Sequence, residues 1–243
     1  RMIGVDAAKV ADVIITHLHF DHAGTLGDFP LARFHLQEQE MQFATGPCMA
    51  HSYFNGAYTV DHVVDMVRQV YCGRVSFVAG DAEIVPGVTV HRIGGHTLGI
   101  QCVRVRTARG WVVLASDASH MYDNFQDMAP YPIVADVRTM LDGFGRLKAL
   151  AESSKHIIPG HDPLVIARYP EANRSSKGIV VRLDLDVDRV VVVEGDDASV
   201  VYEDGLTDSR CYSVSFSILL ATRNRDSGRV GCSESGENSD TSH

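Results

Sequence analysis

The chain has 243 residues, 45% of them hydrophobic and 22% charged, which is ordinary for a globular protein with a sizeable core. The net charge of -9 disfavours nucleic acid as a partner, because phosphate backbones attract basic surfaces. No apolar run approaches the roughly 20 residues that cross a bilayer, and no signal-peptide pattern opens the chain. Five cysteines without CxxC spacing argue against a disulfide framework or a thiolate zinc site. We therefore expect reduced cysteines, no membrane partner and a cytoplasmic location.

Short runs rich in Val and Ile predict a series of strands. Residues 10–16 are apolar almost throughout, which is typical of a strand buried on both faces. Glycine- and aspartate-rich turns separate the later runs. Strands are expected over residues 10–16, 32–37, 74–78, 88–93, 100–107, 111–116 and 156–158.

Apolar residues at helical spacing predict two amphipathic helices. Thr59 precedes the first stripe and Asp136 precedes the second, and both are suitable N-cap residues. Helices interleaved with runs of strands favour a layered α/β or α+β sandwich. The two stripes are Val60, Val63, Val64, Val67 and Val70, and then Val137, Met140, Leu141, Phe144, Leu147 and Leu150.

The character of the sequence changes beyond about Ala172. Acidic residues crowd a weakly patterned stretch, and the last residues are Ser, Gly, Asn and Asp. We expect a folded domain over 1–172 and an atypical acidic segment over 173–243, disordered from about Arg223. Residues 189–193 and 214–220 are possible strands within this segment.

A cluster of potential metal ligands follows the first strand, in the order His17, His19, Asp21 and His22. This H-x-H-x-D-H pattern places four imidazole or carboxylate groups within six residues. His17 and His19, two apart at a strand end, can share one ion, while Asp21 and His22 turn towards a second. A plain turn would need none of these groups.

Three further candidates stand where later strands meet loops. His96 lies in a GGHT sequence, Asp117 in ASDA and His161 in PGHD. Glycines beside the two histidines let the backbone turn sharply and bring an imidazole close to an ion. Each signal is weak alone, but the three in this order after the first motif are strong.

The sequence resembles the metallo-β-lactamase superfamily, and within it the N-acyl-homoserine lactonase branch. The resemblance runs from roughly Val10 to Pro170, over THLHFDHAG, GGHTLG, SDAS and PGHD. It implies an αββα sandwich with the site on loops along one edge of two facing sheets.

The resemblance also implies a ligand set and two metal ions. His17, His19 and His96 would hold one ion, Asp21, His22 and His161 the other, and Asp117 would bridge them. Mixed nitrogen and oxygen ligands suit zinc, although iron, cobalt or manganese can occupy such a set.

The implied reaction is the opening of a small-molecule lactone, an N-acyl-homoserine lactone, by a metal-activated hydroxide. The candidate catalytic residues are Asp117, Asp21, His120 and Tyr122. The lactonase branch carries tyrosine three residues after the bridging aspartate, where this chain has His120. Either His120 or Tyr122 supplies the equivalent hydrogen bond, or His120 instead orients a ligand; the sequence leaves these open.

Two alternatives remain at this point. The metal motifs do not separate a lactonase from a glyoxalase-II-like thioester hydrolase or a lactonase for other ring esters. The second alternative is an inactive metal-binding fragment, because family members ordinarily have strands before the first histidine motif and this chain begins at Arg1. We thus expect an N-terminally truncated domain, and the oligomeric state stays unknown.

Overall fold

The computed structural model describes residues 4–185 and four short strands that follow them. These strands are β9 (Val192–Val193), β10 (Val200–Val201), β11 (Thr207–Asp208) and β12 (Leu219–Leu220). The expected strands at 189–193 and 214–220 therefore coincide in part with β9 and β12, and their other residues lie outside the described ones. The expected disorder from Arg223 also lies outside them, and the domain boundary at 172 stays a prediction.

The first sheet has the strand order β12-β1-β2-β3. β1 (Asp12–Ile14), β2 (Arg33–Gln37) and β3 (Val75–Val78) run parallel, whereas β12 pairs antiparallel with β1. Helix α4 (Val60–Tyr71) covers the outer face, where Val63 and Met66 pack into one core with Phe34 and Leu36. The helix is present as predicted, but of its predicted stripe only Val63 is buried: Val60 is 74% exposed, and Met66, which the spacing did not include, is the second buried residue.

The second sheet has the order β4-β5-β6-β7-β8. Its strands are antiparallel neighbours, except that β8 runs parallel to β7. Helix α6 (Val137–Leu150) packs Phe144 and Leu147 into a core with residues of this sheet, and Asp136 caps its first turn by accepting from Thr139 N at 2.7 Å. The strands are β4 (Asp81–Val85), β5 (Val88–Arg92), β6 (Gln101–Thr107), β7 (Gly110–Ser116) and β8 (Ile157–Pro159).

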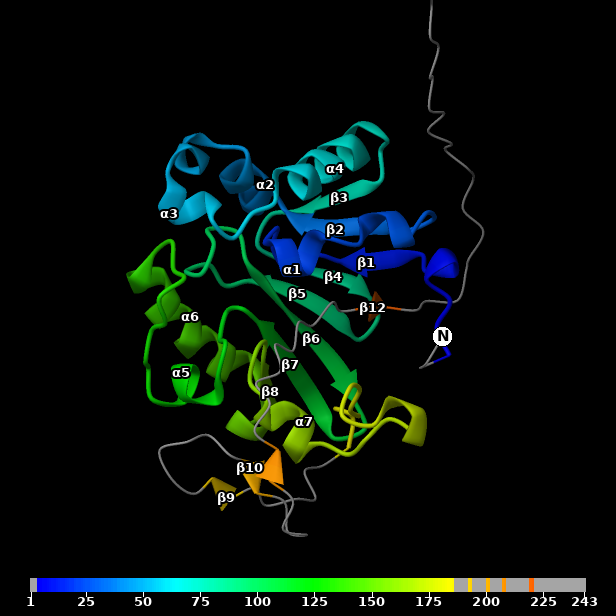
Figure 1. Ribbon diagram of the computed structural model, residues 1–243, viewed down its shortest axis with the longest axis vertical. Coiled ribbons are helices and arrows are strands. Elements are labelled where there is room, and N and C mark those ends of the chain that lie inside the picture. Colours follow the sequence, from blue (N-terminus) through cyan, green and yellow to red (C-terminus); the bar gives the residue numbers. More distant parts are fainter. Residues whose placement is uncertain (1–3, 186–191, 194–199, 202–206, 209–218, 221–243) are drawn as a thin grey trace, which may run out of the picture.

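A third apolar cluster joins the two sheets face to face. Ile14 and Val78 from the first sheet contact Val88, Val90 and Val103 from the second. Helices therefore lie outside two stacked sheets, with α4 over one and α6 over the other (Figure 1). This arrangement confirms the expected αββα sandwich.

The sequence patterns missed the short elements. They are four to seven residues long, too short for a sustained apolar pattern, and several begin next to the ligand motifs. They are β4 (Asp81–Val85), α1 (Phe20–Ala23), α2 (Glu38–Ala44), α3 (Ser52–Asn55), α5 (Tyr122–Gln126) and α7 (Leu164–Arg168).

None of the described helices is long and apolar enough to cross a bilayer. Among the described cysteines, Cys48 and Cys102 are free thiols, whereas Cys72 is disulfide-bonded. The expectation of reduced cysteines is therefore wrong for Cys72.

The α6 core should dominate the stability of the second half of the sandwich. Phe144 is fully buried, so Phe144→Ala should lower the free energy of unfolding by about 3–5 kcal/mol. Val137 is 49% exposed on the same helix, and Val137→Ala should change it by less than about 1 kcal/mol. Urea denaturation measures both, and equal effects of the two variants would contradict this packing.

Candidate metal centre

The candidate ligands lie on segments that follow four strands of the two sheets: the segment after β1, which includes α1 with Asp21 and His22, the loop of His96 after β5, and the segments after β7 and β8. His17 follows β1, Asp117 follows β7 and His161 follows β8. The hydroxyls of Thr16 and Ser116, each one residue before a candidate ligand, lie 2.9 Å apart and join the two sheets at this edge. The site therefore lies where β1 and β7 end side by side.

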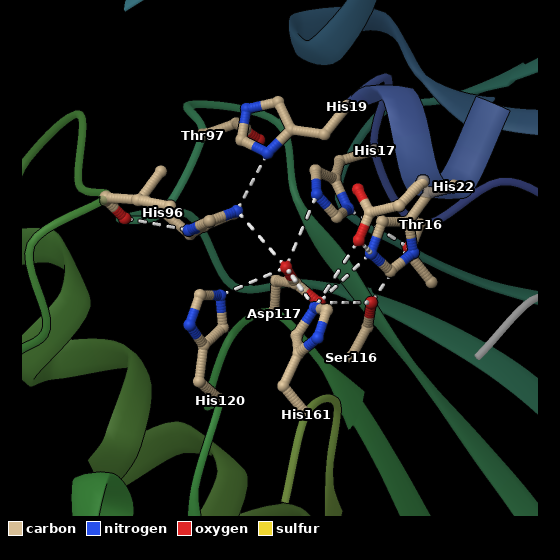
Figure 2. A network of polar contacts seen from close by, with 12 residues as sticks. Thr16, His17, His19, His22, His96, Thr97, Ser116, Asp117, His120 and His161 are labelled. Carbon is tan, nitrogen blue, oxygen red and sulfur yellow. Dashed lines mark hydrogen bonds and ion pairs between the residues drawn. The ribbon is translucent and has the colours of Figure 1, made fainter. Parts of the chain in front are cut away.

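Asp117 occupies the centre of the cluster (Figure 2). Its side chain is only 4% exposed. Five imidazole nitrogens surround the carboxylate, at 3.0 Å for His120, 3.0 Å for His161, 3.2 Å for His22, 3.4 Å for His96 and 3.8 Å for His17.

The seven predicted ligands come together as two groups with donor atoms within 4.8 Å of one another. The first group contains His17, His19 and His96, and the second contains Asp21, His22, Asp117 and His161. Asp117 is close to members of both groups. The three histidines that the family resemblance assigned to one ion form the first group, and Asp117 falls with the other three residues in the second; the assignment of ions to these groups stays a prediction. A further overlapping group contains His96, Asp117 and His120.

The first group consists of imidazoles that burial keeps neutral. Burial lowers the pKa of His19 to about 4 and that of His96 to about 3, and it holds the pKa of His17 well below its ordinary value. A neutral imidazole has a nitrogen lone pair available for a cation. His19 Nδ1 and His96 Nε2 are hydrogen-bonded to each other at 3.0 Å, so these two ring nitrogens point towards the same place.

The second group carries the negative charge. Burial opposes ionisation of Asp117, but hydrogen bonds with His120, His161 and His22 outweigh it and hold the Asp117 pKa well below its usual range. Burial likewise opposes protonation of His22, yet the Asp117 and Asp21 carboxylates raise its pKa to about 9. An anionic group with adjacent imidazoles is a suitable cation ligand set.

One buried atom provides a test of whether a metal ion fits. His17 is fully buried and its Nε2 has no hydrogen-bond partner, while Asp117 Oδ2 lies 3.8 Å away. Leaving a buried polar atom unpaired costs free energy, and a coordinated cation would satisfy it. The donor set, mostly imidazole with two carboxylates, is one that divalent ions such as zinc prefer.

Supporting contacts fix the orientation of His96 and Asp117. His96 Nδ1 lies 2.8 Å from the Ile133 carbonyl, which directs Nε2 into the cluster. The Tyr131 hydroxyl donates to the Asp117 carbonyl. The Tyr131 ring also stacks on His120, with ring centroids 3.9 Å apart.

Gly160 allows the loop of His161 to approach Asp117 closely. A Cβ atom at this position would lie 2.7 Å from the Ser116 carbonyl carbon and 2.8 Å from Asp117 Oδ1. The next residue, His161, donates its backbone N–H to the His120 carbonyl at 2.9 Å. A side chain at residue 160 would therefore push His161 out of the cluster.

The structure places the two candidate substrate-contacting residues differently. His120 lies in the cluster, with Nε2 3.0 Å from Asp117 Oδ2 and a side chain that is 19% exposed. Tyr122 is not brought into it: its ring is buried in the α6 core beneath Arg168, whose guanidinium lies 4.2 Å from the ring centroid.

Sequence reasoning did not identify three supporting residues, Glu40, Tyr58 and Tyr131. Tyr58 packs edge-on against His19, with ring centroids 4.6 Å apart, and its hydroxyl donates to Glu40. Neither Glu40 nor Tyr131 belongs to a ligand motif, and their contacts join segments distant in sequence. The one local signal in the sequence was that Tyr131 precedes a proline in the segment that follows the SDAS motif.

Comparisons with known proteins find N-acyl homoserine lactonases among the relatives of this chain. The N-acyl homoserine lactonase of Bacillus thuringiensis is 30% identical over 166 residues, which cover 67% of this chain and 60% of the relative. The N-acyl homoserine lactonase AttM of Azorhizobium caulinodans is 28% identical over 171 residues, with coverage of 67% and 62%. This chain thus spans about 60% of the length of these relatives.

A solved structure of an N-acyl homoserine lactone hydrolase, with the product N-hexanoyl-L-homoserine bound at its catalytic metal center, matches with a TM-score of 0.54. It is 30% identical, and the match covers 66% of this chain and 59% of that chain. The family model of the Metallo-beta-lactamase superfamily matches residues 1–173, well over half of the sequence. The chain therefore belongs to the metallo-beta-lactamase superfamily.

Proposed function

We propose that this chain is a metal-dependent hydrolase that opens the lactone ring of N-acyl-homoserine lactones. The observation that carries the proposal is the convergence of two ligand groups on Asp117. The similarity to N-acyl homoserine lactonases supports the choice of substrate. A product bound at the metal center of a similar structure supports the same place for the chemistry.

The proposed metal assignment uses both groups. His17, His19 and His96 would hold one zinc ion, Asp21, His22 and His161 would hold the second, and Asp117 would bridge them. Zinc is proposed from the ligand types, and iron, cobalt or manganese would accept the same set. When bound by these residues, the two ions would supply Lewis acidity at the ester carbonyl and would lower the pKa of water towards neutrality.

The residues of the chain orient the ring and move protons. Ring opening adds water to the lactone carbonyl, breaks the ring C–O bond, and leaves a carboxylic acid and a hydroxyl. Asp21 is 21% exposed, against 4% for Asp117, so its carboxylate is the better placed to carry a proton between solvent and the leaving oxygen.

Phe20 supplies an apolar surface for the acyl chain. It is 55% exposed and stands between His19 and Asp21 in the sequence. A large exposed aromatic residue next to a polar cluster is a typical feature of a site that binds an amphipathic small molecule. Its position supports a substrate with an apolar tail attached to the reacting ring.

Proton release from an N-acyl-homoserine lactone tests the proposal directly. The zinc-reconstituted chain should acidify a weakly buffered solution, and a chelator-treated sample should not. Asp117→Asn should reduce the rate by more than the roughly 10- to 100-fold expected for losing a residue that only orients a ligand. Asp127→Asn, an exposed change at the residue that follows α5 (Tyr122–Gln126), should leave the rate unchanged.

A glutathione thioester assayed in parallel separates the alternatives. Cleavage of the thioester alone would assign the chain to the thioester hydrolases. Cleavage of neither substrate by a chain that retains metal would indicate a fragment with ligands but no working substrate site. Full activity of Asp117→Asn would contradict the metal assignment itself.

His120 and Tyr122 should differ sharply in their effect on turnover. His120→Phe keeps a ring to stack on Tyr131 but removes the nitrogen that contacts Asp117, so kcat/KM should fall roughly 10- to 100-fold. Tyr122→Phe should have little effect, because its ring lies in the core. Steady-state kinetics on the lactone measure both. A large loss of kcat/KM in Tyr122→Phe, with none in His120→Phe, would indicate that Tyr122 and not His120 contacts the substrate.

A further inference from the structure

Glu40 is a buried carboxylate that belongs to neither ligand group. It lies on α2, directly after β2, and is 0% exposed. An ionised carboxylate is costly to bury unless hydrogen bonds compensate it. A methionine or leucine would fill the same space without this cost, so the contacts of Glu40 indicate what the carboxylate does.

Three donors from separate segments converge on Glu40. The backbone N–H of Leu18 donates to Oε1 at 3.0 Å, and the Tyr58 hydroxyl donates to the same oxygen at 3.1 Å. The Thr97 hydroxyl donates to Oε2 at 2.5 Å. Both carboxylate oxygens therefore accept hydrogen bonds: Oε1 from the segments of Leu18 and Tyr58, and Oε2 from the loop of Thr97.

Each of these donors is adjacent to a member of the first ligand group. Leu18 stands between His17 and His19, and Thr97 directly follows His96. The Tyr58 ring packs against His19. One carboxylate thus connects all three imidazoles, although they come from segments almost 80 residues apart.

The loop after His96 is built to reach this helix. A Cβ atom on Gly99 would lie 2.0 Å from Glu40 N and 2.3 Å from its Cα, so only glycine allows the approach. The Gly99 backbone also hydrogen-bonds to Glu40. The contact is therefore a close packing of backbone on backbone with the carboxylate inside it.

We propose that Glu40 is a positioning residue that holds His17, His19 and His96 in the geometry of one metal ion. The proposal rests on the two-ion assignment made under the proposed function. It predicts that Glu40 affects the binding of the ion at the first ligand group and not of the ion at the second. Residues that orient metal ligands typically contribute 10- to 100-fold to metal affinity. Glu40 acts on three ligands through their neighbours and contacts no ion itself.

Zinc titration of the metal-free chain tests the proposal. Glu40→Gln keeps the size of the side chain, but its amide nitrogen cannot accept a hydrogen bond. The variant therefore loses the hydrogen bond from either the Leu18 N–H or the Thr97 hydroxyl. We expect one of two zinc ions to bind about 10- to 100-fold more weakly, while the other binds as in the wild type. Glu38→Gln, an exposed change on the same helix, is the matched control and should bind both ions normally.

A double-mutant cycle identifies the ion. His96→Asn removes a ligand of the first group and should weaken the same ion. The ion assigned to the second ligand group should then bind equally well to His96→Asn and to the double variant with Glu40→Gln, because both changes act on the first group alone. Equal weakening of both ions by Glu40→Gln, or wild-type affinity for both, would overturn the proposal.

Thr97→Val keeps the experiment decisive if Glu40→Gln does not fold. It removes one hydroxyl from a fully buried position and should weaken the same ion in the same direction. Unchanged affinity for both ions in a folded Thr97→Val chain would count against the role of Glu40. A wild-type chain that binds two ions but opens no lactone would overturn the proposed function and leave this test valid.

Discussion

The arrangement of the site depends on how the buried Asp117 carboxylate is compensated. It is ionised, and removing such a charge from water is tolerated only where other groups replace the lost hydration. Hydrogen bonds with His120, His161 and His22 perform this task in the structure, and His96 and His17 complete a set of five imidazoles within 4 Å of the carboxylate. They come from the loops after β1 and β8, the loop of His96, and the turn after β7, so these four segments must meet at one point.

The sandwich makes that meeting possible. Stacking the two sheets through Ile14, Val78 and their partners aligns the ends of β1 and β7, and the Thr16 to Ser116 hydrogen bond closes the gap between them. Helix α6 supports the sheet that carries Asp117, while Glu40 on α2 supports the first group of histidines. Fold and site are thus connected through a few polar contacts placed at one sheet edge.

The long strands, both amphipathic helices and the first cluster of candidate ligands were predictable from local signals: an apolar period, or four ligand residues within six positions. The grouping of all seven candidate ligands was implied by the family resemblance and not by these local signals. Glu40 and Tyr131 were not predictable, because their roles depend on contacts with Leu18, Thr97 and Asp117 that only the tertiary fold creates. The choice between His120 and Tyr122 also needed the structure, since both follow Asp117 closely in the chain and only His120 faces the cluster.

The central claim is that two adjacent ions are held by imidazole and carboxylate groups around Asp117. X-ray absorption at the zinc edge of the reconstituted chain tests it most directly. The account predicts nitrogen and oxygen neighbours at about 2.0–2.2 Å, with scattering from imidazole rings, and a second metal at roughly 3.5–4 Å. Sulfur neighbours at about 2.3 Å, or a single isolated ion with no metal neighbour, would contradict it.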